Sequence, residues 1–231
     1  MMRKNNTEGP RRPGRPRAFD RQTALRAAMK LFWEQGFEGA SFNDLTSTMG
    51  INPSSFYNAF GSKELLYKEA LQYYLDSPSE WFSRALSEEQ DVRIAFERLV
   101  ESTATEFTRD DLPAGCMISL AGTHVPPSLD SLREIMISYR SMAEKMMAER
   151  LKQGVKQGQI PSTTDVDLLA SYFGTVFRGM AVQARDGKSR ESLQKIGRMA
   201  LNAWPANPMT GPPASRNRRP RHRTDAHAHA G

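Results

Sequence analysis

The chain has 231 residues, 39% of them hydrophobic, and its mean hydropathy of −0.60 is that of a water-soluble protein. No apolar run approaches the roughly 20 residues needed to span a bilayer, and no charged-then-apolar leader opens the chain, so a membrane protein is excluded and export is not expected. The single cysteine, Cys116, excludes an intramolecular disulfide framework and a cysteine-based zinc finger. We therefore expect a cytoplasmic protein with no membrane partner.

Charge is unevenly distributed along the chain. Residues 1–21 carry seven Arg or Lys and two acidic residues, and residues 205–231 carry five Arg and one acidic residue. Together these ends exceed the net charge of +6 of the whole chain, so the part between them is mildly acidic. Basic ends on an acidic body indicate a polyanionic partner that is met by flexible arms. A solubilising role remains an equal alternative for the C-terminal end.

Helical periodicity begins after Asp20, which is expected to cap a first helix that ends at Gly36. Ser41 is expected to cap the second helix, with Asp44 three residues later in a capping-box arrangement. Gly50 is expected to end this helix. The pattern thus predicts two short helices close to the start of the ordered chain.

A third short helix is expected at residues 52–59, where Pro53 is tolerated in the first turn. Ser62 is expected to cap a longer fourth helix. The later helices are expected at residues 87–108 (with Ser87 and Gln90 as a capping box), 112–122, 128–157, 164–185 and 189–203. No alternating strand of five or more residues occurs, so the sequence predicts an all-α fold, with a disordered tail after Trp204.

Three short helices with a tight glycine turn between the second and the third are typical of a helix-turn-helix. A helix enters the major groove of DNA only if its exposed face is small and polar and its back is anchored by apolar residues. In this segment Ile51, Phe56 and Phe60 are expected to face the core. The side chains left toward solvent are Asn52, Pro53, Ser54, Ser55, Tyr57 and Asn58.

Residues 25–70 resemble the DNA-binding domain of the TetR/AcrR family of bacterial transcriptional regulators. The resemblance rests, in order, on Ala28, Phe32, Gly36, Phe37, Ser41, Leu45, Gly50, Tyr57, Phe60, Lys63, Glu64 and Leu66. It implies a homodimer whose N-terminal domain binds a palindromic operator in double-stranded DNA. It also implies a C-terminal domain that holds an unknown small-molecule effector, whose binding usually releases the DNA.

The resemblance also implies roles for individual residues. Ser41, Tyr57 and Lys63 are expected to contact phosphates. Base reading is expected from the recognition helix, that is from Asn52, Pro53, Ser54, Ser55 and Asn58. This helix carries no Lys or Arg, so reading would depend on short polar groups, thymine methyl contacts and DNA shape. For Ser41 and Ser55, simple helix capping remains the alternative.

The segment from Arg11 to Arg17 resembles an AT-hook, with a Gly-Arg-Pro core between basic residues. Arg15 and Arg17 are expected to enter a narrow minor groove beside the site read by the recognition helix; a solvated basic tail is the alternative. The C-terminal arginines are candidates for nonspecific DNA affinity. The three histidines of that tail have no preorganised surroundings, so no metal and no cofactor are expected.

The last two predicted helices carry apolar residues at heptad-like spacing, which favours a four-helix dimer interface. Gly174 and Gly179 would permit close backbone approach there. The alternative is that these residues only close the core of one chain. The candidate dimerisation residues are Val166, Leu169, Phe173, Val176, Phe177, Met180, Leu193, Ile196, Ala200 and Trp204.

An effector pocket is expected among the helices between residues 80 and 180, although such residues are more often plain core. The candidates are Trp81, Phe82, Phe96, Phe107, Cys116, Met117, Leu120, His124, Met136, Tyr139, Met142, Met146, Tyr172 and Phe173. Twelve methionines suggest an adaptable apolar cavity. Cys116 is either a redox or electrophile sensor near a helix N-terminus or, more commonly for such residues, an inert buried thiol.

These observations predict four regions: a disordered basic arm (1–17), a helix-turn-helix domain (18–66), a helical effector-binding and dimerisation domain (67–204) and a disordered basic tail (205–231). The expected function is that of a homodimeric, ligand-released transcriptional repressor, associated with the nucleoid when it is bound to DNA. The alternative is an architectural DNA-binding protein without an effector. No phosphate-binding glycine loop, His-Glu-x-x-His motif or nucleophile elbow occurs, so an enzyme is not expected.

Overall fold

The computed structural model describes residues 20–76, 80–120 and 129–205. Every regular element in these ranges is a helix and none is a strand, which confirms the predicted all-α fold. In chain order the elements are α1 (Arg21–Gly39), α2 (Phe42–Met49), α3 (Pro53–Phe60), α4 (Lys63–Asp76), α5 (Glu80–Ser87), α6 (Val92–Phe107), α7 (Met117–Leu120), α8 (Asp130–Lys156), α9 (Val166–Arg185), α10 (Arg190–Ala200) and the 3₁₀ turn η2 (Leu201–Ala203).

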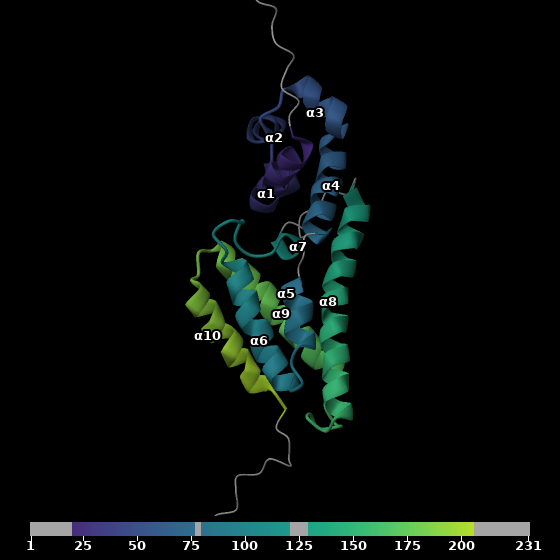
Figure 1. Cartoon of the computed structure of the whole chain (residues 1–231), viewed down its shortest axis with the longest axis vertical. Helices are drawn as coiled ribbons and strands as arrows, with labels where there is room; N and C mark the ends of the chain where they lie inside the picture. The colour runs from purple at the N-terminus through teal and green to yellow at the C-terminus, as the bar shows by residue number, and fades with distance from the viewer. Residues whose placement is uncertain (1–19, 77–79, 121–128, 206–231) are drawn as a thin grey trace, which may run out of the picture.

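The helices form two groups (Figure 1). Helices α1 to α4 lie at one end, and α5, α6, α8, α9 and α10 lie at the other, with the short α7 between them. The first core centres on Phe32, Phe56 and Tyr67, and it also takes in Met117 from α7 and Met136 from α8. The two groups therefore share packing through α7 and the start of α8.

Helix α4 crosses the predicted domain boundary after residue 66. Its residues Tyr67, Ala70 and Leu71 are buried in the first core with α1, so this helix belongs to the helix-turn-helix end along most of its length. The second core begins at Ala85 and contains the inward faces of α6, α9 and α10. Near the end of α4, Tyr74 still packs on Trp33 of α1.

The predicted helix starts at the N-terminal end are confirmed. The Asp20 carboxylate accepts the Gln22 amide at 3.0 Å, and the Ser41 hydroxyl accepts the Asp44 amide at 3.1 Å. Gly36 has a left-handed φ of 70°, as expected for a helix end, but the chain continues helically for three more residues to Gly39. The first regular helix thus ends at Gly36, as predicted, and a further short helical stretch follows the kink there.

One predicted helix start is wrong. Ser87 is the last residue of α5, and α6 begins after Asp91, whose carboxylate accepts the amides of Arg93 and Ile94 at 2.8 and 3.0 Å. The buried Arg150 of α8 explains the break, because its guanidinium binds main-chain carbonyls at the end of α5 and in the following turn. This tertiary contact removes the segment from the helical ladder, and no local pattern announces it.

The other predicted helices are present with small shifts at their ends. The apolar segment predicted at 112–122 forms a shorter helix, α7, of which the structure describes Met117–Leu120. Ser189 caps α10 as expected, accepting the Ser192 amide at 3.2 Å. The long helix α8 runs beside both groups and packs on α9 (Figure 1).

Candidate DNA interface and effector cavity

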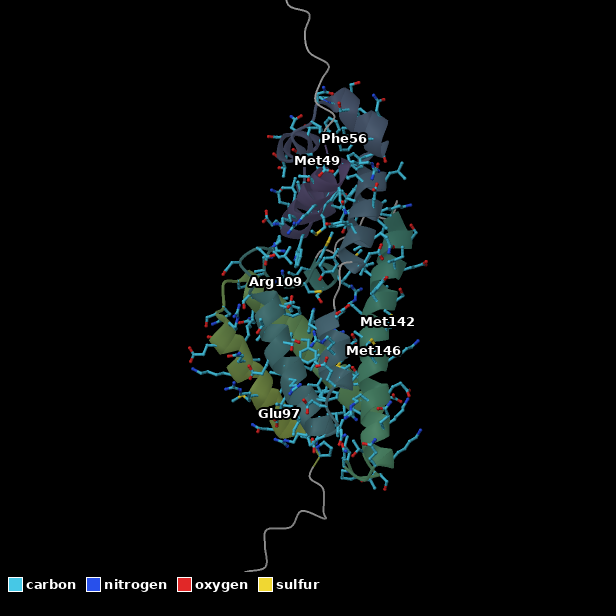
Figure 2. The ribbon with its side chains drawn as sticks, in the orientation of Figure 1. Met49, Phe56, Glu97, Arg109, Met142 and Met146 are labelled. Carbon is cyan, nitrogen blue, oxygen red and sulfur yellow. The ribbon has the colours of Figure 1, made fainter. Side chains whose placement is uncertain are left out.

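Helix α3, the predicted recognition helix, packs against the core through aromatic residues. Phe56 is fully buried and Phe60 is 4% exposed, which confirms that both belong to the core. The Phe56 ring meets the edge of Phe42 of α2 at 4.8 Å between centroids. Gly50, with a φ of 66°, makes the tight turn between α2 and α3. This packing and the Gly50 turn together fix the orientation of α3 relative to α2. Figure 2 shows Phe56 at this end of the molecule.

The outward face of α3 is polar and uncharged. Asn52, Pro53, Ser54 and Asn58 are exposed, and Ser55 is half-buried. The Asn52 side-chain oxygen accepts the Ser55 amide at 2.8 Å and so caps the helix, which leaves the Asn52 amide group free to donate. The structure thus brings the five predicted base-reading residues together, with Asn52 at the N-cap of α3 and the other four within the helix.

Tyr57 and Lys63 flank this face, and each lies over a ring. The Tyr57 ring stacks on Phe42 at 5.4 Å with an interplanar angle of 22°, and the side chain is 56% exposed. The Lys63 ammonium lies 4.5 Å from the centre of the Phe37 ring, a cation–π contact. Both polar ends are therefore positioned by aromatic residues of the domain rather than left free.

The third predicted phosphate contact, Ser41, already has partners within the chain. Its hydroxyl accepts the Asp44 amide and donates to the Asp44 carboxylate at 2.5 Å. The start of α2 still offers main-chain amides to an anion. Arg15 and Arg17 of the predicted arm lie outside the described residues.

Below the helix-turn-helix lies a cavity of about 660 Å³. Its walls come from α4, α5, α6, α7, α8 and α9 and from the segment before α7, with Trp33 added from α1. Met142 and Met146 lie one turn apart on α8 in this part of the molecule (Figure 2). Of the predicted pocket residues, those on its wall are Trp81, Phe82, Phe107, Cys116, Tyr139, Met142 and Met146.

The structure places the remaining pocket candidates elsewhere. Phe96 and Phe173 pack on each other at 4.9 Å in the second core, and Met117 and Met136 are fully buried in the first. Leu120 is half-buried in α7 and is not part of the cavity wall. Tyr172 is 38% exposed on α9. His124 lies outside the described residues.

A polar cluster lies at the end of the cavity next to the helix-turn-helix, and sequence reasoning named only its cysteine. It consists of Trp33, Tyr74, Cys116 and Arg140. The Tyr74 hydroxyl donates to the Cys116 sulfur at 3.5 Å, and burial together with the nearby thiol raises the pKa of Tyr74 well above its usual value. Arg140 binds the Ile118 carbonyl at 2.8 Å, and burial followed by the nearby Arg178 lowers the pKa of Arg140.

A signal for Arg140 is present in the sequence. It falls in register with Met136, Ala143 and Met147 on the inward stripe of α8, where a charged residue is unusual. Trp33 and Tyr74 gave no comparable signal, since aromatic residues at their positions in the sequence pattern are typical of an ordinary core.

The predicted dimerisation residues lie mostly inside one chain. Leu169, Phe173, Phe177, Met180, Leu193 and Ala200 are all buried in the second core. Val166, Val176 and Trp204 are half-buried against that core, and Ile196 is 40% exposed. Most of the heptad-like stripe is therefore the inward face of α9 and α10 within one chain.

Gly174 faces the interior of the chain, whereas Gly179 faces outward. A Cβ at Gly174 would stand 2.9 Å from a carboxylate oxygen of Glu144 on α8, so this glycine serves packing within the chain. Nothing lies within 4 Å of a Cβ built at Gly179. Gly179 therefore faces open space on the outer side of α9.

Metal clusters and membrane spans are both absent from the described ranges. Within residues 20–76, 80–120 and 129–205, no group of three or more His, Cys, Asp or Glu side chains is placed to hold a metal ion. In the same ranges, no helix combines the length and the apolar character that crossing a membrane requires.

Residues 24–70 match the family described as "Bacterial regulatory proteins, tetR family". Over 193 residues the chain is 34% identical to the HTH-type transcriptional repressor ComR of Escherichia coli (strain K12), covering 83% of this chain and 92% of that relative. It is 31% identical over 191 residues to the repressor BdcR of the same organism, with the same shares covered.

A solved structure is similar to this chain over the same share of its length. The TetR family regulator CifR, in a cysteine-substituted form bound to a 26-base-pair double-stranded operator, is 40% identical to this chain, with a TM-score of 0.76. The match covers 83% of this chain and all of that one. The chain therefore belongs to the tetR family of bacterial regulatory proteins and is a helix-turn-helix transcriptional regulator.

Proposed function

We propose that this chain is a homodimeric repressor that binds a palindromic operator through α3 and leaves it when a small molecule fills the cavity. One observation carries the proposal: Trp33 and Tyr74, from helices of the DNA-binding end, form part of the wall of the effector cavity. A ligand there touches the same helices that hold α3 in place. The relatives ComR and BdcR, which are named repressors, and the operator-bound structure of CifR support the same proposal.

The DNA half of the proposal rests on the face of α3. Asn52, Ser54 and Asn58 supply small polar groups for base edges, while Tyr57 and Lys63 contact the phosphates on either side. A two-fold dimer presents two such helices to half-sites about one helical turn apart, which is why the operator is a palindrome.

The dimer half of the proposal uses the outer side of the last two long helices. Leu168, Tyr172, Gly179 and Val182 follow one another at helical spacing on α9, all exposed. Ile196 and Met199 are exposed on α10, which packs beside α9. Exposed apolar residues at this spacing suit a second copy of the same face, and Gly179 lets two α9 helices approach closely.

The release mechanism follows from linkage. A ligand shifts the equilibrium between DNA-binding and released states only by its difference in affinity for the two. Because the cavity wall includes side chains from both helical groups, a change in their relative position alters the ligand's contacts directly. Ligand and operator are then expected to weaken each other's binding by the same factor.

The test is an operator shift assay on palindromes in the DNA that flanks the encoding gene. The variant Tyr57→Ala with Lys63→Ala is expected to weaken operator binding by about tenfold or more, because it removes two groups that bind phosphates. Lys145→Ala, an exposed lysine of α8, is the matched control and should bind as the parent does. Undiminished binding by the double variant would refute the proposed orientation of α3.

The architectural alternative makes a different prediction in the same assay. A repressor is expected to prefer its operator over random DNA by about 10³-fold or more at physiological salt. A ratio near one would identify a nonspecific DNA-binding protein and would overturn the repressor proposal.

A further inference from the structure

The end of the cavity next to the DNA-binding domain offers hydrogen-bond donors and a positive charge. Arg140 has no carboxylate partner among the described residues, and its one hydrogen bond to protein goes to the Ile118 carbonyl. The ring Nε1–H of Trp33 is buried and has no acceptor in the described part of the chain. A buried donor without a partner is costly, and a guanidinium that makes one hydrogen bond has further N–H groups to donate. Both groups therefore favour a ligand that accepts hydrogen bonds.

The acidic side chains of the wall do not cancel this charge. Glu144 is bound by Arg178 at 2.7 Å, and Glu106 is bound by Arg109 at 3.1 Å. Asp76 accepts the Gln72 side chain at 2.7 Å. Glu80, the remaining acidic residue of the wall, is exposed in the first turn of α5. Glu144, one turn from Arg140 on α8, is thus already paired with Arg178 of α9.

The rest of the wall is apolar. Trp81 meets Phe82 at 5.6 Å and Phe107 at 6.5 Å, and Met142 and Met146 face the same space from α8. Aromatic rings and flexible thioethers suit an apolar body of variable shape. The cavity volume of about 660 Å³ is within the usual range for small-molecule sites.

We propose that the effector is a small amphipathic carboxylate, with its carboxylate on the Arg140 guanidinium and the Trp33 ring N–H, and its apolar body among Trp81, Phe107 and Met146. This inference rests on the proposed function, because it names the chemical class of the ligand that releases the operator. A guanidinium presents paired N–H groups that match the two oxygens of a carboxylate. Such a ligand joins α8 to Trp33 of α1, and so connects effector binding to the DNA-binding end.

The test compares three probes that share one aromatic body and differ in charge: phenylacetate, phenylacetamide and phenethylamine. Each is titrated calorimetrically into the full-length protein without DNA, so that the result does not depend on operator binding. Phenylacetate is expected to bind about tenfold or more tightly than the amide, and the amine most weakly, because a charge-assisted pair replaces a neutral contact.

Two variants and one control locate the effect. Arg140→Gln is expected to lower phenylacetate affinity by about tenfold or more and to leave the amide within about twofold, since it removes only the charge-assisted pair. Trp33→Phe keeps a smaller aromatic ring and removes the N–H. It should weaken phenylacetate and, to a lesser extent, phenylacetamide, whose carbonyl accepts the same hydrogen bond, but not phenethylamine, whose ammonium cannot accept it. Arg133→Gln is the control, because Arg133 is an exposed arginine on the same helix that pairs with Asp130.

Three outcomes overturn the proposal: the amide or the amine binds as tightly as the acid, Arg140→Gln keeps the affinity for the acid, or phenylacetate shows no saturable binding at millimolar concentration. Operator binding of the same preparations is measured separately. A protein that binds its operator and fails the probe titration refutes the carboxylate and leaves the repressor proposal standing. A protein that binds phenylacetate through Arg140 and ignores its operator refutes the repressor proposal instead.

Discussion

Arg185, in the last turn of α9, donates hydrogen bonds to the main-chain carbonyls of Trp33 at 2.5 Å and Glu34 at 2.7 Å in α1. These carbonyls lie just before the kink at Gly36. A second cation acts nearby, since the Lys30 ammonium donates to the Asp111 carbonyl at 2.6 Å. Hydrogen bonds from charged side chains to main-chain carbonyls thus attach the DNA-binding end to the helices around the cavity. One of these carbonyls belongs to Trp33, which also lines the cavity.

Replacing Arg185 by Met should therefore loosen this attachment. We expect a decrease of about 1.5–3 kcal/mol in the free energy of unfolding, the range for hydrogen bonds to a charged group. Amide hydrogen exchange in residues 30–39 should become faster, because the kinked end of α1 loses its anchor. Lys188→Met is the control, an exposed cation three residues away. Unchanged exchange in this segment would contradict the assigned role.

The hydroxyl of Tyr67 gives a prediction in the opposite direction. The ring is fully buried between Phe32 and Phe37, and the hydroxyl has no hydrogen-bond partner among the described residues. Tyr67→Phe removes an unsatisfied polar atom and keeps the ring, so it should be neutral or stabilise the fold by up to about 1 kcal/mol. Chemical denaturation measures this, and a destabilisation above that size would mean that the hydroxyl has a partner.

The same group makes stability depend on alkaline pH. Burial raises the pKa of Tyr67 to about 12, whereas an unfolded chain has a tyrosine pKa of about 10. As pH rises above 10 the unfolded state loses its proton first, so stability falls between pH 10 and about 12. Tyr67→Phe should remove this part of the decline. An identical alkaline decline in parent and variant would show that other groups cause it.

Much of the fold could be predicted from the sequence because its helix starts are local. Asp20, Ser41, Asn52 and Ser189 each cap a helix with their own side chain. The start of α6 was placed too early, at Ser87, because Arg150, about 60 residues away, binds the main-chain carbonyls of the turn that precedes α6. A contact of that kind leaves no periodic trace near Ser87.

The same distinction between local and tertiary signals applies to the two candidate sites. The residues of α3 could be named because they share one helix and one face, and the family resemblance covers them. The cavity is built from six helices together with Trp33 of α1, and apolar spacing alone does not separate its wall from the core. Phe107 lines the cavity and Phe96 does not, although both lie on the inward side of α6. Only tertiary packing distinguishes these two residues.

The predicted arm can be tested through salt dependence. A truncation that lacks residues 1–17 should lower operator affinity, and the slope of log affinity against log salt should fall by about 0.9 for every phosphate that the arm neutralises. Arg15→Gln with Arg17→Gln in the full chain should reproduce most of the effect, whereas Arg3→Gln with Lys4→Gln should not. Unchanged affinity and slope in the truncation would refute the arm.

The outer face of α9 and α10 gives the last prediction. Leu168 and Met199 are 67% and 73% exposed, an exposure that a second copy of the same face would relieve. Leu168→Glu with Met199→Glu places four like charges in a two-fold interface and should convert the dimer to a monomer at micromolar concentration, as measured by sedimentation. Ile137→Glu, on the exposed side of α8, changes charge equally per site and should leave the dimer intact.

Operator affinity should fall with the dimer. A monomer engages one half-site, so the second half-site no longer benefits from the high effective concentration that a linked partner provides. Each isolated helix-turn-helix should still bind a half-site weakly, because α3 keeps its anchors Phe56 and Phe42. If the double variant sediments as a dimer, the protomers associate through another surface. If it is a monomer that holds the full palindrome as tightly as the parent, dimerisation contributes nothing to operator recognition.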